Sequence, residues 1–247
     1  MTMFKPILTI YKKELSDYFN SSIAYVFLVL FLLIPNIFFF HFFGGIFREN
    51  NATMRTYFAM LPFVFIVFIP GLTMGGWAKE RNAGTLELLL TFPINAWQVL
   101  LGKFFASLTL VSIALASTIT IPAFTSIAGG FDWGQIFTQY LGAIILAGCY
   151  ISITLFLSSL TNELIDAFLI SAALLLVLTT FGYLSMIVIF PAWLEWFRQT
   201  LVYLSLSTHF ANFSKGVIDT RDILFYAGVT AIFFYLNLRS LETKKGS

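Results

Sequence analysis

Charged side chains are scarce in this 247-residue sequence, in which Asp, Glu, Lys and Arg together make up only 11% of the residues. A soluble domain carries roughly 25% charged residues, because its surface must be hydrated. So few charges could not cover a water-facing surface, and most of the exterior must therefore face lipid. Hydrophobic residues make up 59% of the chain and 30 residues are phenylalanine, which suits lipid-facing and helix-packing surfaces.

Cysteine and phosphate-binding motifs are equally sparse. The single cysteine, Cys149, lies in an apolar run, which excludes a disulfide framework and a cysteine-based metal site and favours a small buried hydrophobic side chain. No G-x-x-x-x-G-K-[ST] sequence occurs, so the chain has no recognisable ATP-binding loop. Any energy that the protein uses must come from a partner or a gradient. Neither a resident cofactor, a metal nor a nucleic acid is expected as a ligand.

Long stretches without Lys, Arg, Asp or Glu predict the fold. A helix needs roughly 20 apolar residues to cross a hydrocarbon core about 30 Å thick. Six stretches meet or approach this length, and they predict an all-α integral membrane protein whose single transmembrane domain covers residues 1–247. The expected spans lie at about residues 22–44, 57–77, 104–128, 138–160, 167–190 and 223–240.

The first 20 residues resemble an amphipathic helix more than a cleavable signal peptide. Apolar residues recur at helical spacing, and Lys5, Thr9 and Asp17 fall on the opposite side. Such a helix would lie in the membrane interface with its polar face toward the cytoplasm. A signal peptide would place its charges before an uninterrupted apolar core, whereas here Lys12 and Lys13 interrupt the apolar pattern.

Lys and Arg are distributed unevenly between the two predicted sides of the membrane. Basic residues occur in the N-terminal segment, after the second span, at Lys103 where the third span starts, and in the C-terminal tail. An even number of spans places all these regions on one side. The positive-inside rule therefore predicts that both termini are cytoplasmic.

The last external connection, from Pro191 to Asp222, is long and aromatic. Trp193, Trp196 and Tyr203 are interleaved with charged residues in it. Trp and Tyr prefer the level of the lipid headgroups. Short re-entrant or interfacial helices are therefore expected between the fifth and sixth spans, and a plain extramembrane loop is the alternative.

The segment between the second and third spans has the most informative pattern. Gly84 and Thr85 can start a short helix that Pro93 ends. Asn95 can then cap the third span, with Gln98 three residues later closing a capping box. A stiff helix held between two spans could transmit a displacement from a docked protein to the bundle. A simple connecting loop explains the pattern equally well on physical grounds.

The sequence of this segment resembles the signature cytoplasmic loop of ABC-2 type transporter permeases. That loop has an acidic–basic pair, then G-T-[LI]-E-x-L, then a proline, then G-K before the third span. The matching residues here are Glu80-Arg81, Gly84-Thr85-Leu86-Glu87-Leu88-Leu89, Pro93 and Gly102-Lys103. Within the family, the chain is most similar to small stand-alone permeases of the gliding-motility-associated or copper-processing type.

The resemblance implies a transmembrane permease subunit in a bacterial inner membrane. The resemblance implies that such a subunit is not itself an enzyme. A separate ATP-binding cassette subunit binds ATP and Mg and hydrolyses the ATP, and this hydrolysis is coupled to export or to a transmembrane conformational change. A second permease copy or a related permease completes a dimer. The resemblance does not specify whether further membrane or periplasmic subunits join the complex. The resemblance places the ATPase-coupling contacts at Glu80, Arg81, Gly84, Thr85, Leu86, Glu87, Leu90 and Pro93, with a smaller contact at Asn162 and Glu163.

A stand-alone secondary transporter or channel is the main alternative. Ion-coupled carriers usually keep ionisable residues deep in the bundle, and no such residue is expected here. Prolines such as Pro62 and Pro70 could break helices, but ordinary kinking also explains them. His41 and His209 have no context that indicates a proton or metal site, and an intramembrane serine hydrolase lacks a G-x-S-x-G sequence.

Overall fold

The computed structural model describes residues 4–42, 54–85, 94–125, 132–187 and 192–245, and all regular structure in these ranges is helical. Six of its helical segments are long and apolar enough to cross a membrane. They are Ala24–His41, Arg55–Asn82, Ala96–Phe124, Trp133–Leu160, Leu164–Tyr183 and Thr220–Thr243. The predicted all-α integral membrane architecture with six spans is therefore confirmed.

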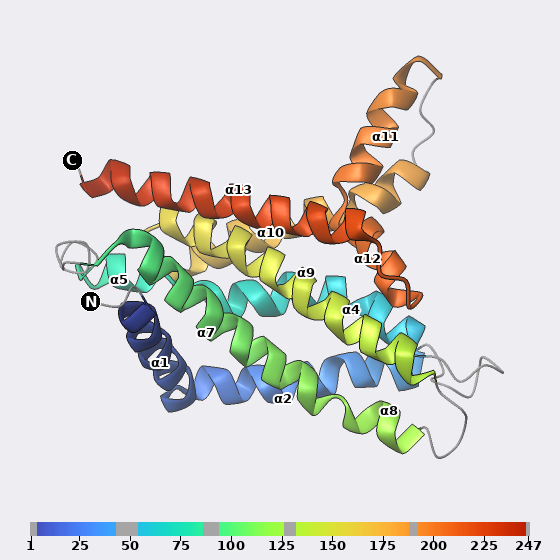
Figure 1. Ribbon diagram of the computed structural model, residues 1–247, viewed down its shortest axis with the longest axis horizontal. Helices are drawn as coiled ribbons and strands as arrows, with labels where there is room; N and C mark the ends of the chain where they lie inside the picture. The colour runs from blue at the N-terminus through green and yellow to red at the C-terminus, as the bar shows by residue number, and fades with distance from the viewer. Residues whose placement is uncertain (1–3, 43–53, 86–93, 126–131, 188–191, 246–247) are drawn as a thin grey trace.

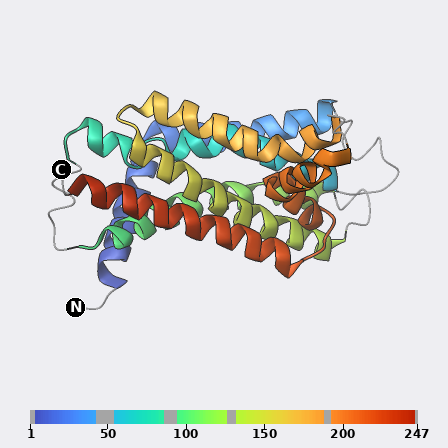
Figure 2. The same cartoon turned by 90° about the horizontal axis from the view of Figure 1, so that it is seen from above.

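The spanning helices run side by side along the long axis of the molecule (Figure 1). They are α2 (Ser22–Ile37, continued by a π-helical turn at Phe38–Phe42), α4 (Arg55–Thr73), α7 (Ala96–Ser117, followed by α8 at Thr120–Thr125), α9 (Trp133–Leu160), α10 (Leu164–Ile187) and α13 (Thr220–Lys245). Both termini lie at the same end of the bundle in two perpendicular views (Figures 1 and 2). An even number of spans requires this arrangement.

Helix α9 forms the centre of the bundle and packs against α4, α7, α10, α12 and α13. Small residues make its close contacts possible, because membrane helices associate largely through tight backbone approach. A Cβ atom on Gly142, for example, would lie 2.5 Å from the Cβ of Phe213 on α12. Ala143 and Ala147 on the same helix are fully buried.

The N-terminal helix α1 (Phe4–Asn20) runs obliquely across the end of the bundle that also holds the C-terminus (Figures 1 and 2). It packs mainly against α7. None of its residues is fully buried, but Ile10, Tyr18 and Phe19 contact the core. The predicted helix is therefore present, and its one-sided packing fits the amphipathic pattern.

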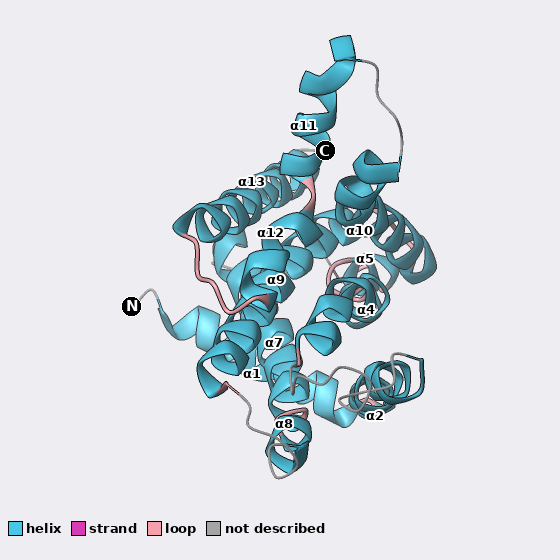
Figure 3. Ribbon diagram, turned by 90° about the vertical axis from the view of Figure 1, so that its right-hand side faces the viewer, coloured by secondary structure: helices cyan, strands magenta, loops and turns pink. Residues whose placement is uncertain are grey.

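Two helices occupy the connection between the fifth and sixth spans, after a short 3₁₀ turn at Ala192–Leu194. Helix α12 (Leu206–Ser214) packs into the bundle against α9, α10 and α4. Helix α11 (Glu195–Leu204) packs against α10 but has no buried residue, and its far end projects beyond the bundle (Figures 1 and 3). The expectation of short helices in this connection is confirmed, and their placement in the lipid interface stays a prediction.

Candidate functional site

The second spanning segment changes direction just before the predicted coupling residues. Helix α4 ends at Thr73, and the short helix α5 (Ala78–Asn82) follows a turn that contains Gly75 and Gly76. A Cβ atom on Gly76 would lie 2.7 Å from Cδ2 of Leu155 and 3.0 Å from the carbonyl oxygen of Thr73, so a larger residue would require both neighbours to shift. The glycine pair therefore allows both the turn and the close approach of α9.

Ser158 of α9 satisfies the backbone groups that this turn leaves without helical partners. Its hydroxyl oxygen accepts hydrogen bonds from the backbone N–H groups of Trp77, at 3.1 Å, and Ala78, at 3.2 Å. The same hydroxyl donates to the carbonyl oxygen of Met74 at 3.0 Å. Unpaired backbone groups are costly inside a membrane protein. The start of α5 is therefore fixed to the central helix.

Gly84 ends α5 in a left-handed conformation, with φ of 66°. The backbone N–H of Gly84 donates to the carbonyl oxygen of Arg81 at 2.9 Å, and the backbone N–H of Thr85 donates to the carbonyl oxygen of Glu80 at 2.9 Å. This is the Schellman arrangement, which a glycine at this position favours. Glu80, Arg81, Gly84 and Thr85 thus belong to one capped turn. The other predicted coupling residues lie outside the described residues: Leu86, Glu87, Leu90 and Pro93.

Arg81 joins this capped turn to the end of α9. Its guanidinium group donates to the carbonyl oxygens of Ser159, at 2.5 Å, and Thr161, at 2.8 Å, and to the side-chain oxygen of Asn162 at 3.2 Å. A cation is favourable at a helix C-terminus, where the last carbonyl groups lack intrahelical partners. The structure therefore brings the two predicted contact regions together, and Glu163 is exposed beside them.

A buried charge cluster links three elements at the same end of the bundle. Lys103 of α7 is only 3% exposed. Its ammonium nitrogen lies 2.9 Å from Oε1 of Glu14 on α1 and 2.8 Å from Oε1 of Glu80 on α5. The same nitrogen lies 5.2 Å from the centre of the Trp77 ring. We call Glu14, Lys103 and Glu80 the triad.

Gly102, the residue before Lys103, allows α1 to approach α7 closely. A Cβ atom at this position would lie 2.6 Å from Cγ2 and 2.8 Å from Cβ of Ile10. Further along the same interface, the hydroxyl groups of Tyr18 and Ser107 lie 3.0 Å apart. Gly102 and Lys103 therefore both serve the docking of α1, one by its lack of a side chain and the other by its charge.

The charges of the triad do not balance, because two carboxylates share one ammonium. Burial by itself would raise the pKa of the Glu14 carboxyl, but the Lys103 ammonium outweighs it, and with Lys13 holds that pKa below its ordinary value. A carboxylate in this position is therefore ionised at neutral pH. It contributes to stability only while it keeps its charge.

We expect the contribution of Glu14 to stability to disappear in acid. Folding lowers the pKa of this carboxyl, so its stabilisation of the protein is complete when the pH is above the pKa in the unfolded chain, which is about 4.3. The stabilisation is lost as the pH falls through the lower value of the folded state. The thermal unfolding midpoint of the wild type should therefore exceed that of Glu14→Gln at neutral pH, and the difference should shrink as the pH falls below about 4.3. A difference that is independent of pH would contradict the ionised pair.

A cavity of about 430 Å³ opens beside the triad. Its charged lining residues carry both signs: Lys13, Glu14, Asp17, Lys79, Glu80 and Lys103. Within the described residues, no group of three His, Cys, Asp or Glu side chains could hold a metal ion. The contacts of the triad, Arg81 and Ser158 link α1, α5, α7 and α9 at this end of the bundle.

The sequence patterns did not indicate Glu14 or the burial of Lys103, which entered only as a marker of orientation and as part of the resemblance motif. The signal for Glu14 was its helical position. It lies four residues from both Ile10 and Tyr18, and thus on the apolar side of α1. A single carboxylate on the packed face of an amphipathic helix requires a buried cation as its partner.

Comparison with known proteins identifies one matching family and two similar curated proteins. A family model described as "ABC-2 family transporter protein" matches residues 8–245. The chain is also similar to the "Probable multidrug ABC transporter permease YbhR" of Escherichia coli strain K12 and to that of E. coli O157:H7. Each is 27% identical over 161 residues, which cover 64% of this chain. The match covers only 41% of the length of these curated relatives.

Proposed function

Because this chain belongs to the ABC-2 family of transporter proteins, we propose that it is the membrane-spanning permease subunit of an ATP-binding cassette transporter. Its own sequence has no phosphate-binding loop, so a separate ATPase subunit binds ATP and Mg and hydrolyses the nucleotide. A second permease copy or a related permease completes the transporter, which works as an exporter or passes a conformational change across the membrane. The curated relatives carry the words "multidrug" and "permease" in their names, and the cargo of this chain stays open.

The triad end of the bundle is the docking face in this proposal. It faces the cytoplasm of a bacterial inner membrane, where the positive-inside rule also places both termini. The ATPase subunit contacts the segment from Glu80 to Pro93, the smaller loop at Asn162 and Glu163, and the polar side of α1. The assignment of these contacts rests on the sequence motif.

One observation supports this function above the others: the coupling segment is tied to three helices by ion pairs and hydrogen bonds. Lys103 holds α1 and α5 against α7, and Arg81 holds the end of α5 against α9. A displacement of α5 would therefore be transmitted to α7 and to the central helix together. An ATPase subunit that contacts α5 differently in its open and closed states could shift the bundle between two arrangements.

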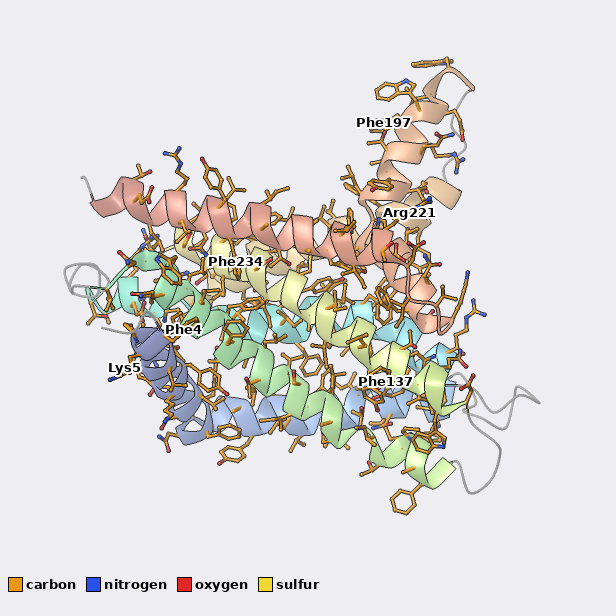
Figure 4. The ribbon with its side chains drawn as sticks, viewed as in Figure 1. Phe4, Lys5, Phe137, Phe197, Arg221 and Phe234 are labelled. Carbon is orange, nitrogen blue, oxygen red and sulfur yellow. The ribbon has the colours of Figure 1, made fainter. Side chains whose placement is uncertain are left out.

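The test is purification of the tagged chain from its native membrane in mild detergent, followed by an ATPase assay of the eluate. Wild type is compared with Glu87→Arg, which reverses a charge inside the predicted coupling segment. We expect an ATP-hydrolysing subunit to copurify with the wild type and to be lost or uncoupled in the variant. Arg221→Glu is the matched control, because Arg221 is exposed at the opposite end of the bundle (Figure 4).

Three outcomes separate the possibilities. Copurification that Glu87→Arg abolishes and Arg221→Glu leaves intact supports both the function and the docking face. Copurification that is unaffected by Glu87→Arg supports the permease function but contradicts the predicted contact. Recovery of the chain alone, under conditions that preserve membrane complexes, would favour the stand-alone secondary transporter or channel.

A further inference from the structure

A second buried polar cluster lies at the opposite end of the bundle, around His209 of α12. The His209 side chain is 9% exposed and the Asp222 side chain, in the first turn of α13, is 5% exposed. Nδ1 of His209 lies 2.6 Å from Oδ1 of Asp222, and Nε2 lies 2.9 Å from the carbonyl oxygen of Tyr203 in the last turn of α11. One imidazole ring therefore contacts α11 and α13 while it belongs to α12.

The surroundings of the ring fix its orientation. Phe225 stacks on it with the ring centres 3.9 Å apart, and Tyr203 packs edge-on at 5.3 Å. Asn212 donates a hydrogen bond to the second carboxylate oxygen of Asp222 at 2.8 Å. Both oxygens of Asp222 thus have partners. The ring cannot turn away without breaking several contacts.

Both atoms that face the ring nitrogens are hydrogen-bond acceptors. A backbone carbonyl oxygen cannot donate, and an ionised carboxylate has no hydrogen to give. A neutral imidazole carries one N–H, so one of its two close contacts would bring two lone pairs together. A protonated Asp222 would instead leave one ring nitrogen without hydrogen, which a spectrum of the ring nitrogens distinguishes.

We propose that His209 is doubly protonated in the folded protein, and that the His209–Asp222 ion pair clamps α11 to the bundle. Helix α11 has no buried residue of its own, and the carbonyl oxygen of Tyr203 is one of its otherwise unpaired terminal groups. The ring supplies the hydrogen that this carbonyl requires. The doubly protonated ring donates to both acceptors at once, and so joins the end of α11 to the first turn of α13.

Among the described residues, no other charged side chain at this end has a hydrogen bond or ion pair to the ring. Arg198 of α11 lines the same small cavity as His209 and is paired with Glu195. In the turn before α13, Asp219 accepts a hydrogen bond from the backbone N–H of Arg221. Asp132 caps α9, and the remaining charges are Lys215 at the end of α12 and Arg55 at the start of α4. Within the described residues, Asp222 is the one carboxylate bonded to the ring.

The charge of His209 can be measured directly, because the chain has only two histidines. His41→Gln leaves His209 as the single histidine, and this variant is labelled with ¹⁵N-histidine and reconstituted in lipid bilayers. Solid-state NMR at neutral pH should show that both ring nitrogens carry hydrogen. A spectrum with one bare ring nitrogen would overturn the proposal. Asp222→Asn keeps the shape of the contact without its charge, and in this variant we expect one ring N–H to be lost.

The clamp itself is tested by a distance between α11 and α13. Spin labels are placed at the exposed positions Gln199 and Ile232 in a Cys149→Ala background. We expect a narrow distance distribution when Asp222 is present and a broader one in Asp222→Asn. A distribution that is unchanged in Asp222→Asn would refute the clamp. These measurements need no ATPase subunit, so their outcome is independent of the proposed function.

Discussion

Replacing Lys103 with methionine should destabilise the folded protein by about 3–5 kcal/mol, because removing one partner of a buried ion pair leaves an uncompensated charge. In this case two carboxylates, Glu14 and Glu80, would be left facing one another without the ammonium that separates them. Methionine keeps most of the side-chain volume, so the loss reports on charge more than on packing. The free energy of unfolding in mixed detergent micelles measures the effect.

The matched control removes all three charges together. The variant Glu14→Gln, Glu80→Gln, Lys103→Met has no buried ion, and replacing a whole ion cluster by neutral groups is often neutral or stabilising. We therefore expect the triple variant to regain most of the stability that Lys103→Met loses. If the triple variant is as unstable as the single one, Lys103 acts through packing and the electrostatic account of the triad is wrong.

Replacing Arg81 with methionine should leave the bundle folded and reduce the coupling between ATP hydrolysis and the permease. The variant loses the hydrogen bonds to Ser159, Thr161 and Asn162 that join the coupling segment to α9. Allosteric coupling between two sites is typically worth about 1–3 kcal/mol, so its loss corresponds to about a 5–150-fold decrease. The permease-dependent stimulation of ATPase activity in bilayers measures the change.

Arg81→Lys is the control that separates charge from geometry. Lysine keeps the positive charge at the end of α9 but cannot reach three oxygens with one planar group. We expect Arg81→Lys to bind the ATPase subunit as well as the wild type and to show intermediate coupling. Full coupling in both variants would mean that the link between α5 and α9 plays no part in transmission.

The general architecture could be predicted from sequence because it depends on local chemistry. Long apolar stretches need no tertiary information to be recognised as spans, and all six are present among the described residues. The start of α7 could also be predicted, because it depends on residues that are neighbours in sequence. The side chain of Gln98 accepts a hydrogen bond from the backbone N–H of Asn95 at 3.1 Å, as the predicted capping box requires.

The buried charge clusters could not be predicted in the same way, because their members come together only through packing. Lys103 is 89 residues from Glu14 and 23 from Glu80. His209 is 13 residues from Asp222 across a turn whose geometry no periodicity indicates. Sequence context therefore indicated no proton or metal site at His209, although its ring contacts both α11 and α13.

Several predictions from the motif stay predictions. The coupling roles of Glu80, Arg81, Gly84 and Thr85, and of Asn162 and Glu163, depend on a partner subunit. The placement near gliding-motility or copper-processing permeases likewise rests on the sequence alone. What the structure adds is a physical reason for part of the motif: Glu80, Gly102 and Lys103 hold α1 in place.

The long separation between Glu14 and Lys103 has a consequence for biogenesis. The ribosome completes α1 well before it makes the third span, so the Glu14 carboxylate must wait for a partner that does not yet exist. A helix with one apolar side can wait at the bilayer surface without aggregating. Its final docking is then a late step that occurs once α7 has been inserted. Ribosome-bound chains that end before residue 103 should therefore leave α1 accessible to added protease, and longer chains should protect it.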